Sequence, residues 1–299
     1  MNIREWGVAL LCTVIPGDDL TPITLAQLRT LGARVRAMGA PAQPMNELRP
    51  EDLCRMGYPA PEAARICALL DREERLERYL DGARSKGIYP LTRLSPEYPE
   101  RLRALLGMNA PPILFCAGDA DLLSKPAVAV VGSRALHEPG RTFCQNIGKL
   151  AAGEGVVLVS GNAVGADQTA QDACYGAGGS VICFLADELS RHLPRSDREL
   201  MISAGGYDLP FTNARALSRN HFIHAQGRKV FVAQCDSPKG GTWAGTTENL
   251  SRGWSEVYAC DDGTPAMGEL IERGATPVPK TGLRSLEEAV PFQGRFLAY

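Results

Sequence analysis

The chain has 299 residues, 44% of them hydrophobic, and a formal net charge of −2. This is enough for one full hydrophobic core and a second, smaller one. The nearly neutral charge excludes a protein that binds nucleic acid through a uniformly basic surface, so any strand-binding surface must be a local patch. The nine cysteines form no Cys-x-x-Cys pair. Their odd number, without a signal peptide, predicts a reducing, cytoplasmic environment in which the thiols are small core residues.

Residues 1–85 are predicted to form a small helical N-terminal domain. Segments 62–70 and 73–84 carry apolar side chains at helical spacing, and prolines divide the rest into short helices. The apolar stretch at 10–15 is too short to span a bilayer, so no membrane partner is expected.

A predicted α/β region follows at residues 86–262, and residues 263–299 form a C-terminal extension. Apolar, β-branched runs at 127–131, 156–159 and 180–185 predict strands that are buried on both faces. Helical patterns between them predict a Rossmann-like, mostly parallel sheet with flanking helices. In such a sheet, ligands bind in the crevice outside the carboxyl ends of the strands.

The turn after the run at 127–131 is the first candidate for this crevice. Gly132 turns the chain, Ser133 is predicted to cap the next helix, and Arg134 adds a fork of hydrogen-bond donors. An ordinary strand–helix turn with a surface arginine has the same pattern, so both interpretations stay open.

The turn after the run at 156–159 repeats this arrangement. Ser160 and Gly161 turn the chain, and Gly165 precedes a predicted helix that includes Asp167. Asp167 either caps that helix or faces the crevice and accepts a hydrogen bond from a ribose hydroxyl or a base. Direct contact with a phosphate is not expected, because the two negative charges repel.

The third element is a predicted helix at 214–226. Arg215 and Arg219 share one face of it and repel each other unless an anion or a carboxylate lies between them. His221 and His224 are also close on this helix, but no third ligand has fitting spacing, so no metal site is expected.

The fourth element is a turn rich in glycine and threonine at 239–248. Thr246 and Thr247 are predicted at the start of a helix, where hydroxyl and free N–H groups suit an anion. A large aromatic residue in such a loop, here Trp243, packs into a core or stacks on a ligand. The turn begins Lys239-Gly240-Gly241-Thr242-Trp243.

The ordered set of these motifs resembles the DNA-processing protein A family, also called DprA or Smf. The resemblance covers roughly residues 86–261, and the N-terminal helical segment is similar in position to a small domain of many family members. The C-terminal extension is too short for the winged-helix domain that some members append. The matching motifs are Val131-Gly132-Ser133-Arg134, Ser160-Gly161-x-Ala163-x-Gly165-x-Asp167, Arg219-Asn220-His221 and Gly240-Gly241-Thr242-Trp243.

The resemblance implies a non-catalytic protein that binds single-stranded DNA, protects it and helps to load RecA in natural transformation or recombination. It also implies a homodimer without a cofactor. Trp243 and Phe222 are the candidate side chains for base stacking. The expected nucleic-acid- or phosphate-binding residues are Gly132, Ser133, Arg134, Ser160, Gly161, Gly165, Asp167, Arg219, Asn220, Lys239, Gly240, Gly241, Thr242 and Trp243, with no catalytic residue and no metal.

A second hypothesis follows from departures from the family's pattern. His221 replaces that family's third arginine, and the stretch at 245–248 is similar to a signature of lysine-decarboxylase-like nucleotide phosphoribohydrolases. The alternative is therefore a nucleotide sensor or an N-glycosidic hydrolase, as in antiphage defence. A hydrolase needs a carboxylate to stabilise an oxocarbenium-like centre, and Glu248 and Asp167 are the candidates.

Overall fold

The computed structural model describes residues 1–38, 48–235 and 240–290. The helical segment comes first, with α1 (Ile3–Cys12), α2 (Leu25–Ala37), α3 (Pro50–Arg55), α4 (Ala60–Leu70) and α5 (Glu73–Arg84). It is followed by β1 (Ile88–Thr92), α6 (Glu100–Leu105), η2 (Gly107–Asn109), β2 (Ile113–Gly118), η3 (Ala120–Ser124), β3 (Ala127–Val131), α7 (Glu138–Gly153), β4 (Val157–Ser160), α8 (Ala166–Gly176), β5 (Val181–Leu185), η4 (Leu189–Arg191), β6 (Glu199–Ala204), α9 (Asn213–Gln226), β7 (Lys229–Val232), α10 (Gly241–Arg252), β8 (Glu256–Asp261), α11 (Pro265–Glu272), β9 (Thr276–Pro279) and η5 (Leu286–Glu288).

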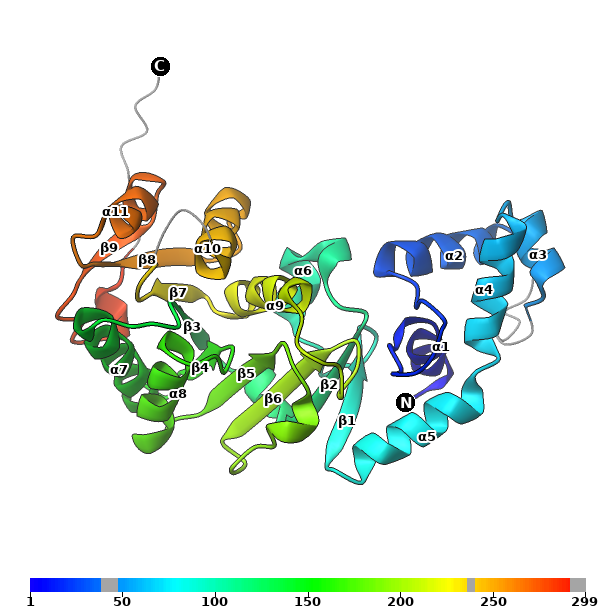
Figure 1. Ribbon diagram of the computed structural model, residues 1–299, viewed down its shortest axis with the longest axis horizontal. Helices are drawn as coiled ribbons and strands as arrows, with labels where there is room; N and C mark the ends of the chain where they lie inside the picture. Colours follow the sequence, from blue (N-terminus) through cyan, green and yellow to red (C-terminus); the bar gives the residue numbers. More distant parts are fainter. Residues whose placement is uncertain (39–47, 236–239, 291–299) are drawn as a thin grey trace, which may run out of the picture.

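The described strands form one nine-stranded sheet in the order β1-β2-β6-β5-β4-β3-β7-β8-β9. All pairs from β6 to β9 are parallel, while β2 is antiparallel to both of its neighbours. Helices α7 and α8 cover one face, and α9, α10 and α11 cover the other (Figure 1). The predicted α/β fold with a mostly parallel sheet is confirmed.

The direction of winding reverses between β3 and β7. From β3 the chain passes through α7 to β4 and continues outward to β5 and β6. From β6 it returns through α9 to β7, on the other side of β3, and continues to β8 and β9. The connection that leaves β3 runs through α7 on one face of the sheet, and the connection that leaves β7 runs through α10 on the other face (Figure 1). The carboxyl ends of β3 and β7 therefore border an open crevice.

Two hydrophobic cores hold the described chain together. The larger one surrounds the sheet and includes Leu10 of α1 and Tyr79 of α5, so the helical segment shares it. The Tyr79 hydroxyl donates to Asp208 at 2.6 Å and accepts from the Tyr207 N–H at 2.9 Å, which fixes α5 to the loop after β6. A smaller core lies among α1 to α4. The boundaries at 85/86 and 262/263 stay predictions. Beyond residue 262, β9 adds a strand to the same sheet.

Eight of the nine cysteines are buried, as the sequence indicates for small core residues, and Cys54 is exposed. In the described ranges, none of the helices combines the length and the apolar character that crossing a membrane requires.

Candidate functional site

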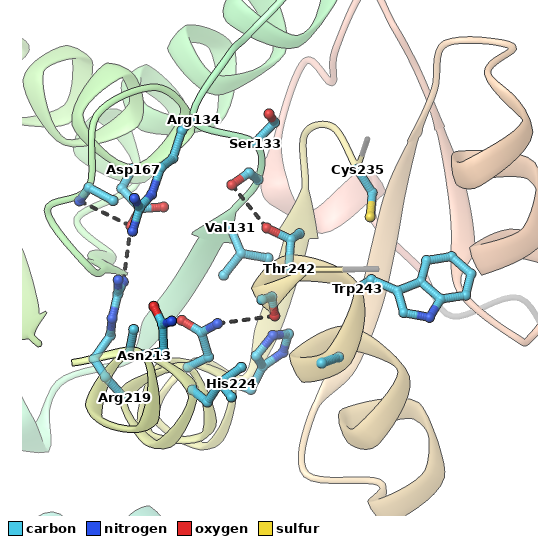
Figure 2. Close-up of a pocket in the computed structure, with 18 of the residues that line it drawn as sticks. Val131, Ser133, Arg134, Asp167, Asn213, Arg219, His224, Cys235, Thr242 and Trp243 are labelled. Atoms are coloured by element: carbon cyan, nitrogen blue, oxygen red, sulfur yellow. Dashed lines mark hydrogen bonds and ion pairs between the residues drawn. The ribbon is translucent and has the colours of Figure 1, made fainter. Parts of the chain in front are cut away.

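A pocket of about 770 Å³ lies at the carboxyl ends of β3 and β7, where the winding of the sheet reverses. Its walls come from the turn after β3, the first turn of α8, one face of α9 and the start of α10 (Figure 2). Ten of the residues predicted for the site line it, namely Gly132, Ser133, Arg134, Asp167, Arg219, Asn220, Gly240, Gly241, Thr242 and Trp243. Ser160, Gly161 and Gly165 are not among the lining residues, and Lys239 lies outside the described residues.

The turn after β3 places Arg134 at the surface of the pocket. A side chain at Gly132 would put its Cβ 2.7 Å from the Cβ of Ala166, so only glycine lets this turn pack against α8. The Ser133 hydroxyl accepts from the N–H of Ala135 at 3.0 Å. The prediction that Ser133 caps the next helix is therefore wrong. The N-cap of α7 is His137, because the chain continues for four residues before the helix begins.

Ser160 and Gly165 do not line the pocket, but their contacts position the elements that do. The buried Ser160 hydroxyl donates to the carbonyl of Val130 at 2.7 Å and thereby ties β4 to β3. Gly165 is the N-cap of α8 with φ +94°, and a Cβ there would lie 2.5 Å from the carbonyl oxygens of Ser133 and Arg134. The backbone conformation and the close contact both require glycine.

A buried ion pair between Asp167 and Arg219 forms the base of one wall. Arg219 Nη1 and Asp167 Oδ2 are 3.1 Å apart, and each side chain is only 8% exposed. A Cβ at Gly161 would fall 1.1 Å from Arg219 Nη1, so glycine makes room for the guanidinium. Asp167 lies in the first turn of α8 and also accepts from the Ala163 N–H. Arg219 is thus neutralised within the protein, although its Nε has no hydrogen-bond partner in the described part of the chain.

Arg215 has a structural position outside the pocket. Its guanidinium donates to the carbonyls of Ala186 and Ala204, both at 3.1 Å, and to the Ser203 hydroxyl at 3.0 Å. The two arginines on this face of α9 therefore avoid repulsion because each has its own internal acceptors.

The N-terminus of α10 forms the opposite wall. The helix begins at Gly241, earlier than the predicted start at Thr246, and Thr246 is buried inside it. The Thr242 hydroxyl donates to the Gly132 carbonyl at 3.0 Å, and Asn220 Nδ2 donates to the Gly241 carbonyl at 3.1 Å. These bonds hold the first turn of α10, whose first backbone N–H groups have no acceptor within the helix, beside the pocket.

Both aromatic side chains predicted to stack on bases belong to the core. Trp243 is 9% exposed, points away from Arg134 and Arg219, and has the Arg273 guanidinium over its ring (Figure 2). Phe222 packs against Phe184 with ring centroids 6.0 Å apart.

The aromatic side chain available at the pocket is Phe211, which the sequence analysis missed. It is 47% exposed, and the Arg134 guanidinium lies 5.7 Å from its ring centroid. A signal was present in the sequence, because Phe211 stands between Pro210 and the N-cap Thr212, outside any apolar periodicity.

Glu248 lies away from the pocket lining. It pairs with His221 at 2.9 Å and with Arg252 at 3.9 Å, on the outer part of α10.

No cluster of three or more metal-ligating side chains occurs among the described residues. His224 does line the pocket, and burial, helped by the neighbouring His221, lowers its pKa to about 3.

Comparisons with known proteins identify the family of the chain. The model of the family described as DNA recombination-mediator protein A matches residues 90–282. The chain belongs to this family. It is 37% identical over 181 residues to DprA of Streptococcus pneumoniae, covering 56% of this chain and 63% of that protein. It is 32% identical over 219 residues to DprA of Bacillus subtilis, covering 68% and 72%. The predicted family is therefore confirmed.

Two solved DprA structures have the same fold. That of the Streptococcus pneumoniae protein superposes with a TM-score of 0.70 at 22% identity, covering 93% of this chain and 94% of that chain. That of the Helicobacter pylori protein, described for its single-stranded DNA binding mode, has a TM-score of 0.53 at 22% identity, covering 64% and 90%. The sequence alignment covers less than two thirds of the Streptococcus protein, so the activity and partners of that whole protein are proposals for this chain.

The buried ion pair yields a test of stability. Arg219→Met leaves the Asp167 charge buried without its partner, which should lower the free energy of unfolding by about 3–5 kcal/mol in a urea titration. The double variant Asp167→Leu/Arg219→Met removes both charges and should recover most of this loss. If Arg219→Met had the same free energy of unfolding as the wild type, the ion pair would not stabilise this part of the fold.

His224 yields a test of pH dependence. Its pKa is about 3 in the folded chain against an ordinary value of 6.5, so the unfolded chain binds the proton first as the pH falls. The folded state should therefore lose about 1.4 kcal/mol of stability per pH unit well below 6.5, and nothing above it. The difference between the wild type and His224→Phe, measured by urea unfolding at pH 7.5 and 5.5, isolates this contribution. The same pH dependence in both proteins would contradict it.

Proposed function

We propose that the chain binds single-stranded DNA in the crevice between β3 and β7 and acts in DNA uptake and recombination. The observation that carries the proposal is the pair formed by Arg134 and Phe211 at the pocket, beside the N-terminus of α10. A single strand needs a cation for its phosphates and an exposed ring for its bases, and this pair supplies both.

The charge arrangement favours a strand at this surface. Arg134 is exposed, and no carboxylate pairs with it in the ranges that the structure describes. The N–H groups at the start of α10 have no acceptor within the helix, and they add the positive end of a helix dipole on the other side of the pocket. Binding then depends on a local patch, as a chain with a net charge of −2 requires.

The finer proposals come from the family. DprA-type proteins are expected to protect incoming DNA, to assist RecA loading and to act as homodimers without catalysis. Family membership supports the role in recombination, and the binding mode described for the Helicobacter relative supports the binding of single-stranded DNA. We propose the same roles for this chain, with the described crevice as the place where DNA binds.

The alternative of a nucleotide hydrolase has less support from the site. A hydrolase needs a carboxylate near the sugar to stabilise positive charge in the transition state. Glu248 pairs with His221 and Arg252 outside the pocket lining, and Asp167 is held by Arg219.

Arg134 and Phe211 should contribute in two different ways that the salt dependence separates. Arg134→Ala should weaken oligothymidylate binding and lower the slope of log affinity against log salt by about 0.7, because one phosphate contact is lost. Phe211→Ala should weaken binding by about 1–3 kcal/mol with the slope unchanged, since stacking releases no counterion.

The matched control is Arg84→Ala, which removes an exposed arginine of α5 that does not line the pocket. It should leave affinity and slope as in the wild type. Equal losses in the Arg84 and Arg134 variants would indicate a diffuse charge effect and contradict a strand-binding crevice.

A substitution of Glu248 distinguishes DNA binding from nucleotide hydrolysis. In the binding reaction Glu248→Gln should leave the affinity for single-stranded DNA unchanged, and neither protein should release a base from nucleoside monophosphates. Base release by the wild type that disappears in the variant would instead assign Glu248 a catalytic role and replace the proposal.

A further inference from the structure

Helix α2 carries positive charge that the helical segment does not neutralise. It contains Arg29, Arg34 and Arg36 and no carboxylate, whereas α1, α3, α4 and α5 each carry at least as many carboxylates as arginines. Most arginines of those other helices pair within one turn, as Arg78 does with Glu74 at 3.6 Å. In the part of the chain that the structure describes, no carboxylate pairs with an arginine of α2. Their charge is therefore available to an anionic ligand.

Two of these arginines lie on one exposed face of α2. Arg29 and Arg36 are seven residues apart, which corresponds to two turns or about 10 Å along the helix, and both side chains are exposed. Only the small residues Gly32 and Ala33 lie between them on this face. A Cβ at Gly32 would lie 3.5 Å from Arg36 Nη1, so the Arg36 guanidinium extends back along the face toward Arg29. An extended anion can therefore approach both guanidinium groups without meeting a large side chain.

The positive face continues onto η2, the turn that leads into β2. Arg29 Nη1 lies 3.9 Å from Met108 Sδ of η2, and Arg93 Nη1 donates to the Gly107 carbonyl of the same turn at 2.9 Å. Arg93 has no carboxylate partner within the described ranges. Figure 1 shows α2 next to α6, the helix that precedes this turn. We call the surface formed by Arg29, Arg36 and Arg93 the α2 surface.

The chemistry of the α2 surface suits a phosphate backbone whose bases are already stacked. A guanidinium binds a phosphate through two parallel hydrogen bonds, and such contacts carry no sequence information. A single strand is usually held by aromatic rings as well, and the chain has no phenylalanine, tyrosine or tryptophan between Trp6 and Tyr58. A helix that binds a membrane buries a large apolar face, whereas this face carries Gly32 and Ala33. Duplex DNA presents phosphates alone and fits best.

We propose that the α2 surface binds the phosphates of double-stranded DNA, independently of sequence. The proposal goes beyond the function proposed for the crevice, because none of the three arginines lines that pocket. A chain with both sites holds a single strand in the crevice and a duplex at α2, as DNA with a single-stranded tail would supply.

The test compares the affinity of the full chain for a blunt duplex and for oligothymidylate over a range of salt concentrations. Arg29→Ala/Arg36→Ala should bind the duplex more weakly and lower its slope of log affinity against log salt by about two, because two phosphate contacts of about 0.9 each are lost. The affinity for oligothymidylate should stay as in the wild type. Arg29→Lys/Arg36→Lys keeps both charges and should keep the slope. These variants should fold, because both side chains are exposed.

Arg78→Ala is the matched control, because Arg78 is also exposed but is already paired with Glu74, and it should change neither affinity. A wild type that does not bind the duplex at low salt, or an unchanged slope in the double alanine variant, would overturn the proposal. Loss of oligothymidylate binding in that variant would assign α2 to the single strand, and binding of anionic phospholipid vesicles in place of the duplex would assign it to a membrane; either result would overturn the proposal too. Arg134→Ala should weaken only the binding of oligothymidylate, so a failure there concerns the crevice and not α2.

Discussion

The buried ion pair between Asp167 and Arg219 joins the two layers of the protein at the crevice. Asp167 belongs to α8 on one face of the sheet and Arg219 to α9 on the other, and they meet beyond the end of β4. The contact is possible because Gly161 has no side chain where the guanidinium lies. The ion pair thereby fixes the separation of α8 and α9. The side of the pocket opposite α10 depends on this contact.

The internal use of arginine reduces the positive charge that a chain with a net charge of −2 can present at its surface. Arg72 binds carbonyls at the end of α1 together with Asp18, and Arg101 binds carbonyls at the end of α9. Burial lowers the pKa of Arg101 and Arg215, which shows how far these charges are removed from water. Counting basic residues therefore overestimates the charge available to a strand, and the position of Arg134 matters more than the total.

The parallel part of the fold could be predicted because its strands are continuous apolar runs; β3 was predicted with its observed ends. The antiparallel edge was harder to see. Pro90 argues against a strand at β1 and is tolerated because β1 lies at the edge of the sheet. In β6, buried Glu199 breaks the apolar pattern, and its partner Arg195 is found only in the folded structure.

The site could be predicted as a set of turns but not as a set of contacts. Glycine at 241 indicated a loop from its low helix propensity, whereas the helix begins there so that α10 can approach Asn220. Pro139 in the first turn of α7 was the available signal that Ser133 is not its cap. The residues around Trp243 and Arg219 give no signal that these two side chains are buried, because their burial depends on elements far away in the chain.

The described crevice has charged groups at its mouth and neutral groups at its floor. Its mouth carries Arg134 and the N-terminus of α10, whose attraction for phosphate is electrostatic and weakened by salt. Its floor carries neutral groups on α9, and His224 stays uncharged because burial keeps its pKa far below that of the solvated ring. A charged histidine there would lose the bond from Asn249 and would add attraction for any phosphate, whatever its base. Burial of a neutral ring thus keeps the positive charge of the crevice at its mouth.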